Sequence, residues 1–139
     1  MSSLPDKSIL HLLHRATQIG ADRFSRELGD TDCTPRQLVV LAAIAAKEGS
    51  SQTQIVEMTG VDRSTLADIM RRLLKRGLIS RRRTRQDARA YAITLTPQGR
   101  RMLELGRPAL ARVETEMLAP IPIKRRAELL DLLEMLTPV

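Results

Sequence analysis

The segment spanning residues 51–99 constrains the fold most, because two short capped helical patterns are followed there by an arginine-rich hairpin pattern. Ser51 begins a capping-box pattern and predicts a short helix over 52–58, after which Gly60 can supply a turn. Asp62 can cap a second helix, whose apolar residues recur at helical spacing: Leu66, Ile69, Met70, Leu73 and Leu74. Two short helices joined by a tight glycine turn predict a helix-turn-helix.

A hairpin pattern follows these two helices. Residues 78–80 predict a strand, residues 81–89 a polar loop, and residues 90–95 a returning strand with alternating apolar side chains. Such a hairpin would form a small wing beside the second helix. The predicted fold is therefore mainly α with a small β-wing, a winged helix-turn-helix.

Positive charge is concentrated in the same part of the chain. Residues 61–101 hold twelve Arg or Lys against three acids, a net charge of +9, whereas the whole chain carries +7. Eleven of these bases are Arg, whose planar fork of donors matches phosphate oxygens and the O6/N7 edge of guanine. One Phe, one Tyr and no Trp leave few rings on which single-stranded bases could stack. The sequence thus predicts double-stranded DNA as a partner.

The second short helix is expected to read the DNA. Its first turns would enter the major groove with short polar side chains, and its later cations would meet phosphates. Asp68 is unusual there because phosphates repel a carboxylate, so we expect it either to accept from a cytosine amino group or, preferably, to tether Arg71 or Arg72. In the wing, Asp87 can pair with Arg89 and hold it toward the minor groove. The predicted DNA-binding residues are Arg63, Ser64, Thr65, Asp68, Arg71, Arg72, Lys75, Arg83, Arg85, Asp87 and Arg89.

Two helical patterns precede this segment. The first begins at Asp6 or Ser8 as its cap, is amphipathic, and ends at Gly29. The second begins with a capping box at Thr34 and continues through Lys47. Because this second pattern is apolar on nearly every face, it predicts a central buried helix.

Two more helical patterns follow the hairpin. One begins at Thr96 and contains Pro108, which should kink it. After a break at residues 120–122, the last helix carries an apolar face of Leu129, Leu132, Leu133 and Leu136. Apolar terminal helices attached to a unit that can cover its own core need a further partner. We therefore expect a single domain over 1–139, with 34–99 as the DNA-binding lobe and 1–30 and 100–139 as dimerisation helices.

Three motifs in order resemble the wing signature of the MarR family of bacterial transcriptional regulators. They are Gly-Leu-Ile-Ser-Arg at 77–81, Asp-Ala-Arg at 87–89 and Leu-Thr-Pro-Gln-Gly at 95–99. Thr-Pro-Arg-Gln-Leu at 34–38 lies upstream at a suitable distance, and the chain length is typical of the family. The likeness covers nearly the whole chain.

The resemblance implies an obligate homodimer in which the first and last helices of two subunits intertwine. It further implies repression by occupation of a palindromic operator. Two-fold symmetry would then place the two recognition helices at half-sites about one helical turn, ~34 Å, apart. The resemblance assigns the wing-tip arginine to Arg89, its companion to Asp87, and the start of the recognition helix to Arg63, Ser64 and Thr65.

The resemblance also implies a site for a small anionic or aromatic effector between the dimer helices and the DNA-binding lobe. His11, His14 or Arg15 could meet such a molecule there. No cofactor and no metal are expected, because two histidines at i and i+3 are not a metal site without further ligands.

Three other functions stay open. A sequence-neutral architectural DNA-binding protein would share the charge block, although short polar residues in the recognition helix disfavour it. Cys33 precedes a helix N-terminus, which lowers a thiol pKa, and so allows a redox-sensing regulator. An enzyme using Cys33 with a histidine would lack a recognisable oxyanion hole, glycine-rich loop or third orienting group, so we expect no enzymatic activity. The lone cysteine and the short apolar runs predict a cytoplasmic protein without a membrane span.

Overall fold

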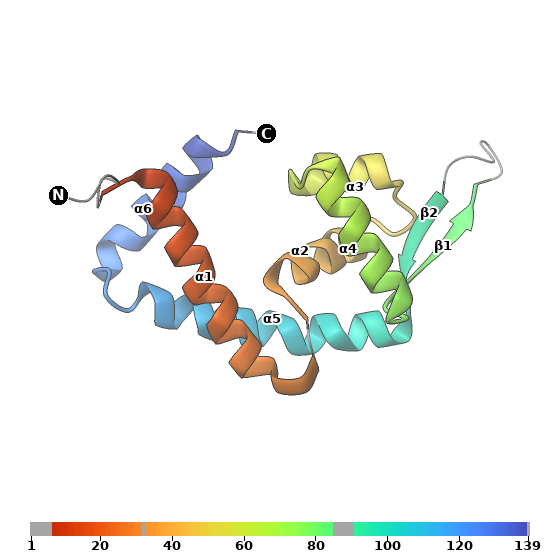
Figure 1. Cartoon of the computed structure of the whole chain (residues 1–139), viewed down its shortest axis with the longest axis horizontal. Helices are drawn as coiled ribbons and strands as arrows, with labels where there is room; N and C mark the ends of the chain where they lie inside the picture. The colour runs from red at the N-terminus through yellow and green to blue at the C-terminus, as the bar shows by residue number, and fades with distance from the viewer. Residues whose placement is uncertain (1–6, 32, 85–90, 139) are drawn as a thin grey trace.

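The computed structural model describes residues 7–31, 33–84 and 91–138. Helices α1 and α6 lie at one end, α2, α3, α4 and the hairpin form a lobe at the other, and α5 connects the two (Figure 1). In chain order the elements are α1 (Ile9–Leu28), a 3-10 turn η1 (Gly29–Thr31), α2 (Pro35–Ala46), α3 (Gln52–Thr59), α4 (Arg63–Lys75), β1 (Ile79–Arg83), β2 (Tyr91–Leu95), α5 (Pro97–Leu118) and α6 (Ile123–Leu136). The mainly helical fold with a two-stranded wing is confirmed.

Capping residues set the helix starts as the sequence predicts. Thr34 and Ser51 each accept from the N–H three residues on, and the glutamine at that third position accepts from the capping residue, closing two capping boxes. The Asp62 side chain caps α4. Ser8 caps α1, and Asp6, the other candidate, lies outside the described residues.

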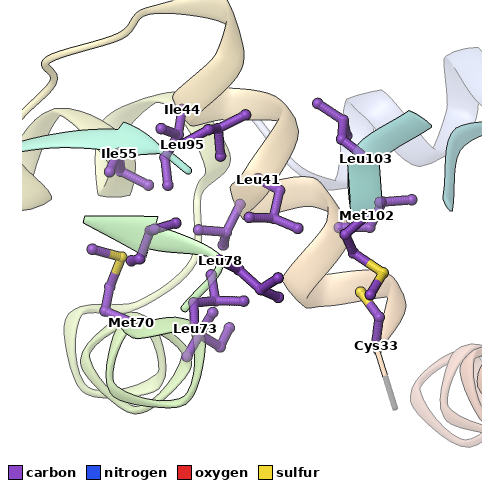
Figure 2. Close-up of a cluster of buried hydrophobic side chains, with 14 of the residues drawn as sticks. Cys33, Leu41, Ile44, Ile55, Met70, Leu73, Leu78, Leu95, Met102 and Leu103 are labelled. Atoms are coloured by element: carbon purple, nitrogen blue, oxygen red, sulfur yellow. The ribbon is translucent and has the colours of Figure 1, made fainter. Parts of the chain in front are cut away.

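Helix α2 is the buried centre of the lobe. Leu38, Val40, Leu41 and Ile44 are at most 2% exposed. The helix packs against α3, β2 and α5. Figure 2 shows Leu41 and Ile44 of α2 facing side chains from α4 and from the hairpin, among them Leu73, Leu78 and Leu95. One apolar core therefore fixes α4 and the wing relative to each other.

The wing is an antiparallel pair in which Ile79 lies opposite Leu95 and Arg83 opposite Tyr91. Strand β1 continues to Arg83, so the prediction that a loop begins at Arg81 is wrong for Arg81–Arg83. Three consecutive arginines have the polarity of a loop, but the ladder is made by backbone groups and tolerates charged side chains on a solvated sheet.

A compact joint connects the wing to α5. The Thr96 N–H donates to the Leu78 carbonyl at 3.1 Å, and the Thr96 hydroxyl donates to the Gly77 carbonyl at 2.6 Å. The same hydroxyl accepts from the Gly99 N–H at 3.0 Å and caps α5. A Cβ on Gly99 would stand 2.0 Å from the Leu78 carbonyl oxygen, so this approach requires glycine.

Helix α5 runs along the base from the wing toward α1 and α6 (Figure 1). Pro108 lies inside α5, which stays helical from Pro97 to Leu118; the expected kink stays a prediction. Helix α1 packs on α5, with ion pairs between Arg112 and Glu27 at 3.1 Å and between Arg23 and Glu116 at 3.8 Å.

The outer helices expose much apolar surface. None of the described residues of α6 is buried, and Phe24 is the buried residue of α1. The exposed large apolar side chains of these two helices are Ile9, Leu10, Leu12, Leu13, Ile19, Ile123, Leu130, Leu132, Met135 and Leu136. Even so, none of the helices in the described ranges is long and apolar enough to cross a membrane.

Candidate nucleic-acid interface

Helix α4 has one buried face and one solvated face. Leu66, Ile69, Met70 and Leu73 pack into the core. The predicted recognition residues of α4 are exposed or half-buried: Arg63, Ser64, Thr65, Asp68, Arg71, Arg72 and Lys75. All seven are accessible to solvent, and we call this set of side chains the α4 face.

Asp62 organises the start of α4. Its Oδ2 accepts from the Thr65 N–H at 3.0 Å and from the Ser64 hydroxyl at 2.9 Å. Hydrogen bonds from the side chain and backbone of Thr65, and then from the Ser64 side chain, lower the pKa of Asp62 to about 2. Because the Ser64 hydroxyl donates to Asp62, its oxygen lone pairs are left to accept from a base edge.

Asp68 holds two arginines of α4 at once. Its Oδ1 lies 2.9 Å from Arg71 Nη2, and its Oδ2 lies 3.0 Å from Arg72 Nε. The tether predicted for one arginine is thus confirmed for both. These side chains are about half exposed or more, so the pairs contribute little to stability. Their effect is to restrict where the two guanidinium groups lie.

The C-terminal half of α4 borders a basic hollow of about 560 Å³. The hollow extends to the start of α2, and its lining carries four cations and one acid: Thr34, Gln37, Asp68, Arg71, Arg72, Lys75 and Arg76. Arg76 also donates to the Thr31 carbonyl and so joins α4 to the turn between α1 and α2. The cations of the C-terminal half of α4 therefore extend a positively charged surface to the start of α2.

The wing carries a second cationic surface. The Arg81 guanidinium lies 4.7 Å from the Tyr91 ring centroid, and that of Arg83 lies 5.8 Å from it. A hydrogen bond and the charge of Arg83, together with the charge of Arg81, lower the pKa of Tyr91. The remaining predicted wing residues, Arg85, Asp87 and Arg89, lie outside the described residues.

Sequence reasoning missed Arg81 and Tyr91. The signal was the register of the two strands: with Arg83 opposite Tyr91, alternation places Arg81 beside Tyr91 on the same face of the sheet. A predicted first strand that continued through Arg83 would have placed these arginines opposite the second strand.

His11, His14 and Arg15 are exposed on α1. They do not line the cavity of about 540 Å³ that lies between the outer helices and the start of α2. Thirteen residues line that cavity: Leu13, Ala16, Thr17, Gly20, Ala21, Thr34, Pro35, Arg36, Leu110, Val113, Glu114, Met117 and Leu133. The α1 residues that line it include Leu13, Ala16 and Thr17, and neither His14 nor Arg15 is among them. An effector role for these three side chains stays a prediction.

Cys33 is 4% exposed, and its Sγ donates to the Thr34 carbonyl at 3.6 Å. Burial limits access of an oxidant to this thiol, so the redox role stays a prediction that the packing disfavours. In the described ranges, no three His, Cys, Asp or Glu side chains are close enough to hold a metal.

Known proteins resemble this chain in sequence. A family model described as MarR family matches residues 31–90. The transcriptional regulator HosA of Escherichia coli is 32% identical over 108 residues, which are 78% of this chain and 78% of HosA.

Two solved structures resemble it in fold. The PcaV transcriptional regulator of Streptomyces coelicolor, in complex with its natural ligand, superposes with a TM-score of 0.87 at 30% identity over 99% of this chain and 97% of PcaV. The transcriptional repressor CouR, bound to a 23-mer DNA duplex, superposes with a TM-score of 0.83 at 27% identity over 99% of this chain and 100% of CouR. With its winged helix-turn-helix fold and this level of similarity to HosA, the chain belongs to the MarR family of transcriptional regulators.

Proposed function

We propose that this protein is a homodimeric, sequence-specific DNA-binding repressor whose operator is palindromic and whose release is controlled by a small effector. The observation that carries the proposal is the α4 face. It combines short polar side chains at the helix start with cations farther along, and the core holds it in a fixed relation to an arginine-bearing wing. Residues 63–68 would read base edges, and Arg71, Arg72 and Lys75 would contact phosphates. Arg89 would enter the minor groove, with Arg85 and Asp87 beside it.

A homodimer would cover the exposed apolar side chains of α1 and α6. Exposed aliphatic residues concentrated on two neighbouring helices are typical of an interface. In this arrangement residues 1–30 and 100–139 dimerise and residues 34–99 bind DNA. The two-fold axis would set the two α4 helices about one DNA turn, ~34 Å, apart.

The cavity beneath the start of α2 is our candidate effector site. Its lining is largely apolar, and among the described lining residues it carries one cation, Arg36, and one acid, Glu114. Such a lining suits a small anionic or aromatic molecule. PcaV, of similar fold, was solved with its natural ligand. Because the cavity lies between the outer helices and the lobe, a ligand that prefers one lobe position would change the spacing of the two α4 helices and release DNA by population shift.

Fluorescence anisotropy tests the proposal, with duplex DNA from upstream of the protein's own gene compared with a shuffled duplex at two salt concentrations. We expect a preference on the order of 10³-fold or more for the upstream duplex, saturating at one dimer per site. Equal affinities that collapse with salt would instead indicate a sequence-neutral architectural protein. Because DNA is the proposed partner, we place the protein in the bacterial cytoplasm.

A further inference from the structure

Arg81, Arg83 and Tyr91 share one face of the wing. Alternation along the paired strands puts them on the same side as Ile79, Ile93 and Leu95, which are at most 7% exposed and pack into the core. We call this side the inner face of the wing. Farther from the core, it carries Arg81 and Arg83 beside the Tyr91 ring. Arg82, opposite Ala92, lies on the outer face.

The inner face has a defined position relative to DNA if the function proposed above is correct. One phosphodiester strand separates a major groove from the neighbouring minor groove. With α4 in the major groove and the wing tip in the minor groove, that strand must pass between α4 and the wing. It would therefore run along the inner face, past Arg81 and Arg83.

We propose that Arg81, Arg83 and Tyr91 form a phosphate-binding site for this strand, in which Tyr91 positions the two guanidinium groups. A guanidinium stacked on an aromatic face keeps its N–H edge available to phosphate oxygens. The Tyr91 ring also restricts side-chain freedom before DNA arrives, which reduces the entropy lost on binding. The Arg83 guanidinium, 5.8 Å from the centroid of the same ring, is restricted in the same way.

A double-mutant cycle on DNA affinity tests this positioning role, with a shuffled duplex as the probe because a phosphate site acts on any sequence. Replacing both arginines by alanine should reduce the salt slope of binding by about one to two units. Y91L should weaken binding by about 3- to 10-fold in the wild-type background and have almost no effect in the R81A/R83A background. Y91F keeps the ring and should stay within about twofold of wild type.

Arg82 provides the matched charge control. R82A removes the same charge from the other face of the same strand, so its effect should be additive with that of Y91L. An equal loss for Y91L in all backgrounds, or no loss in wild type, would overturn the proposal.

Tyr91 is the only tyrosine, and the chain has no tryptophan, so an ultraviolet titration of the free protein reports this ring alone. R83A should raise the pKa of Tyr91 toward its ordinary value, and R82A should not. Far-ultraviolet circular dichroism shows whether each variant is folded, since the Tyr91 variants have no tyrosine to titrate. A protein that binds the upstream and shuffled duplexes equally, yet obeys the cycle, would contradict sequence-specific regulation and support the wing site. An additive cycle in a protein that still prefers the upstream duplex would contradict the wing site and support sequence-specific regulation.

Discussion

Asp62 and Asp68 both bind donors of α4, but with different consequences. Asp62 satisfies N-terminal donors that have no partner within the helix and so stabilises α4 itself. Asp68 binds Arg71 and Arg72, which are exposed and face the proposed DNA surface. One acid therefore acts on folding, and the other acts on the arrangement of charge for recognition.

Asp62→Ala should lower the Tm at neutral pH, because α4 loses its capping carboxylate. The pKa of Asp62 is about 2 in the folded state and 3.8 for an ordinary aspartate. The ionised carboxylate therefore stabilises the fold fully above pH 3.8, and this stabilisation is lost as the pH falls toward 2. The Tm difference between wild type and Asp62→Ala should shrink across that window. Asp22→Ala, in the interior of α1, is the control. A Tm difference that stays constant from pH 5 to about 2 would contradict the capping role.

Asp68→Asn should separate affinity from specificity. Loss of a negative charge beside phosphates should strengthen binding to a shuffled duplex, whereas release of Arg71 and Arg72 should reduce the preference for the upstream duplex. Stability should change by less than about 1 kcal/mol, since both pairs are exposed. Anisotropy with the two duplexes measures both effects, with the exposed Glu57→Gln as a charge control. An unchanged preference ratio would count against the tether.

At the scale of elements, the lobe depends on joints between segments far apart in the sequence. Thr96 and Gly99 bring the start of α5 against Leu78, before β1. Glu48, after α2, accepts from the Leu95 N–H at 3.2 Å and pairs with Arg100 at 2.6 Å. These two contacts therefore join the turn after α2, the end of the wing and α5.

Gly99→Ala should destabilise the fold by about 1–3 kcal/mol, because the new methyl group would collide with a backbone carbonyl that cannot rotate away. The higher helix propensity of alanine offsets only part of this. Gly20→Ala is the control: its Cβ would meet the flexible Met117 Sδ at 3.0 Å, so a neutral or slightly stabilising result is expected. Chemical denaturation of both variants measures the difference. Equal effects would contradict the close approach at Gly99.

At the scale of the whole molecule, a monomer leaves α6 with little to pack against and covers only the side of α1 that packs on α5. The described part of α6 has no buried residue, and most large apolar residues of α1 face solvent. Burial of apolar surface contributes about 25 cal/mol per Å², so a second copy that covers both helices would stabilise them substantially.

Leu10→Glu combined with Leu132→Glu should convert the proposed dimer into a monomer, because both side chains are about half exposed or more on the outer helices. A monomer would bind with one α4 instead of two. This loss of bivalency should weaken binding to the upstream duplex by on the order of 10²-fold or more. Sedimentation velocity reports the oligomeric state. Met58→Glu is the control: it places a charge on an exposed apolar residue of α3 in the lobe and should leave the oligomeric state unchanged. A double variant that sediments like wild type would argue for another interface.

The sequence by itself determined the helix starts, the glycine turn between α3 and α4, the buried character of α2 and the position of the charge block. The charge block follows from composition alone. The other features depend on side chains within about four residues of each other, as the caps at Thr34, Ser51 and Asp62 do.

Only the tertiary structure decided which distant residues meet. The stack of Arg81 and Arg83 on Tyr91 requires the strand register. The cavity requires four helices to pack together, and it is lined by Thr17 and Arg36 instead of by His14. The need for glycine at residue 99 appears only when α5 meets the Leu78 carbonyl. Such contacts depend on register and packing between segments that no local pattern relates to each other.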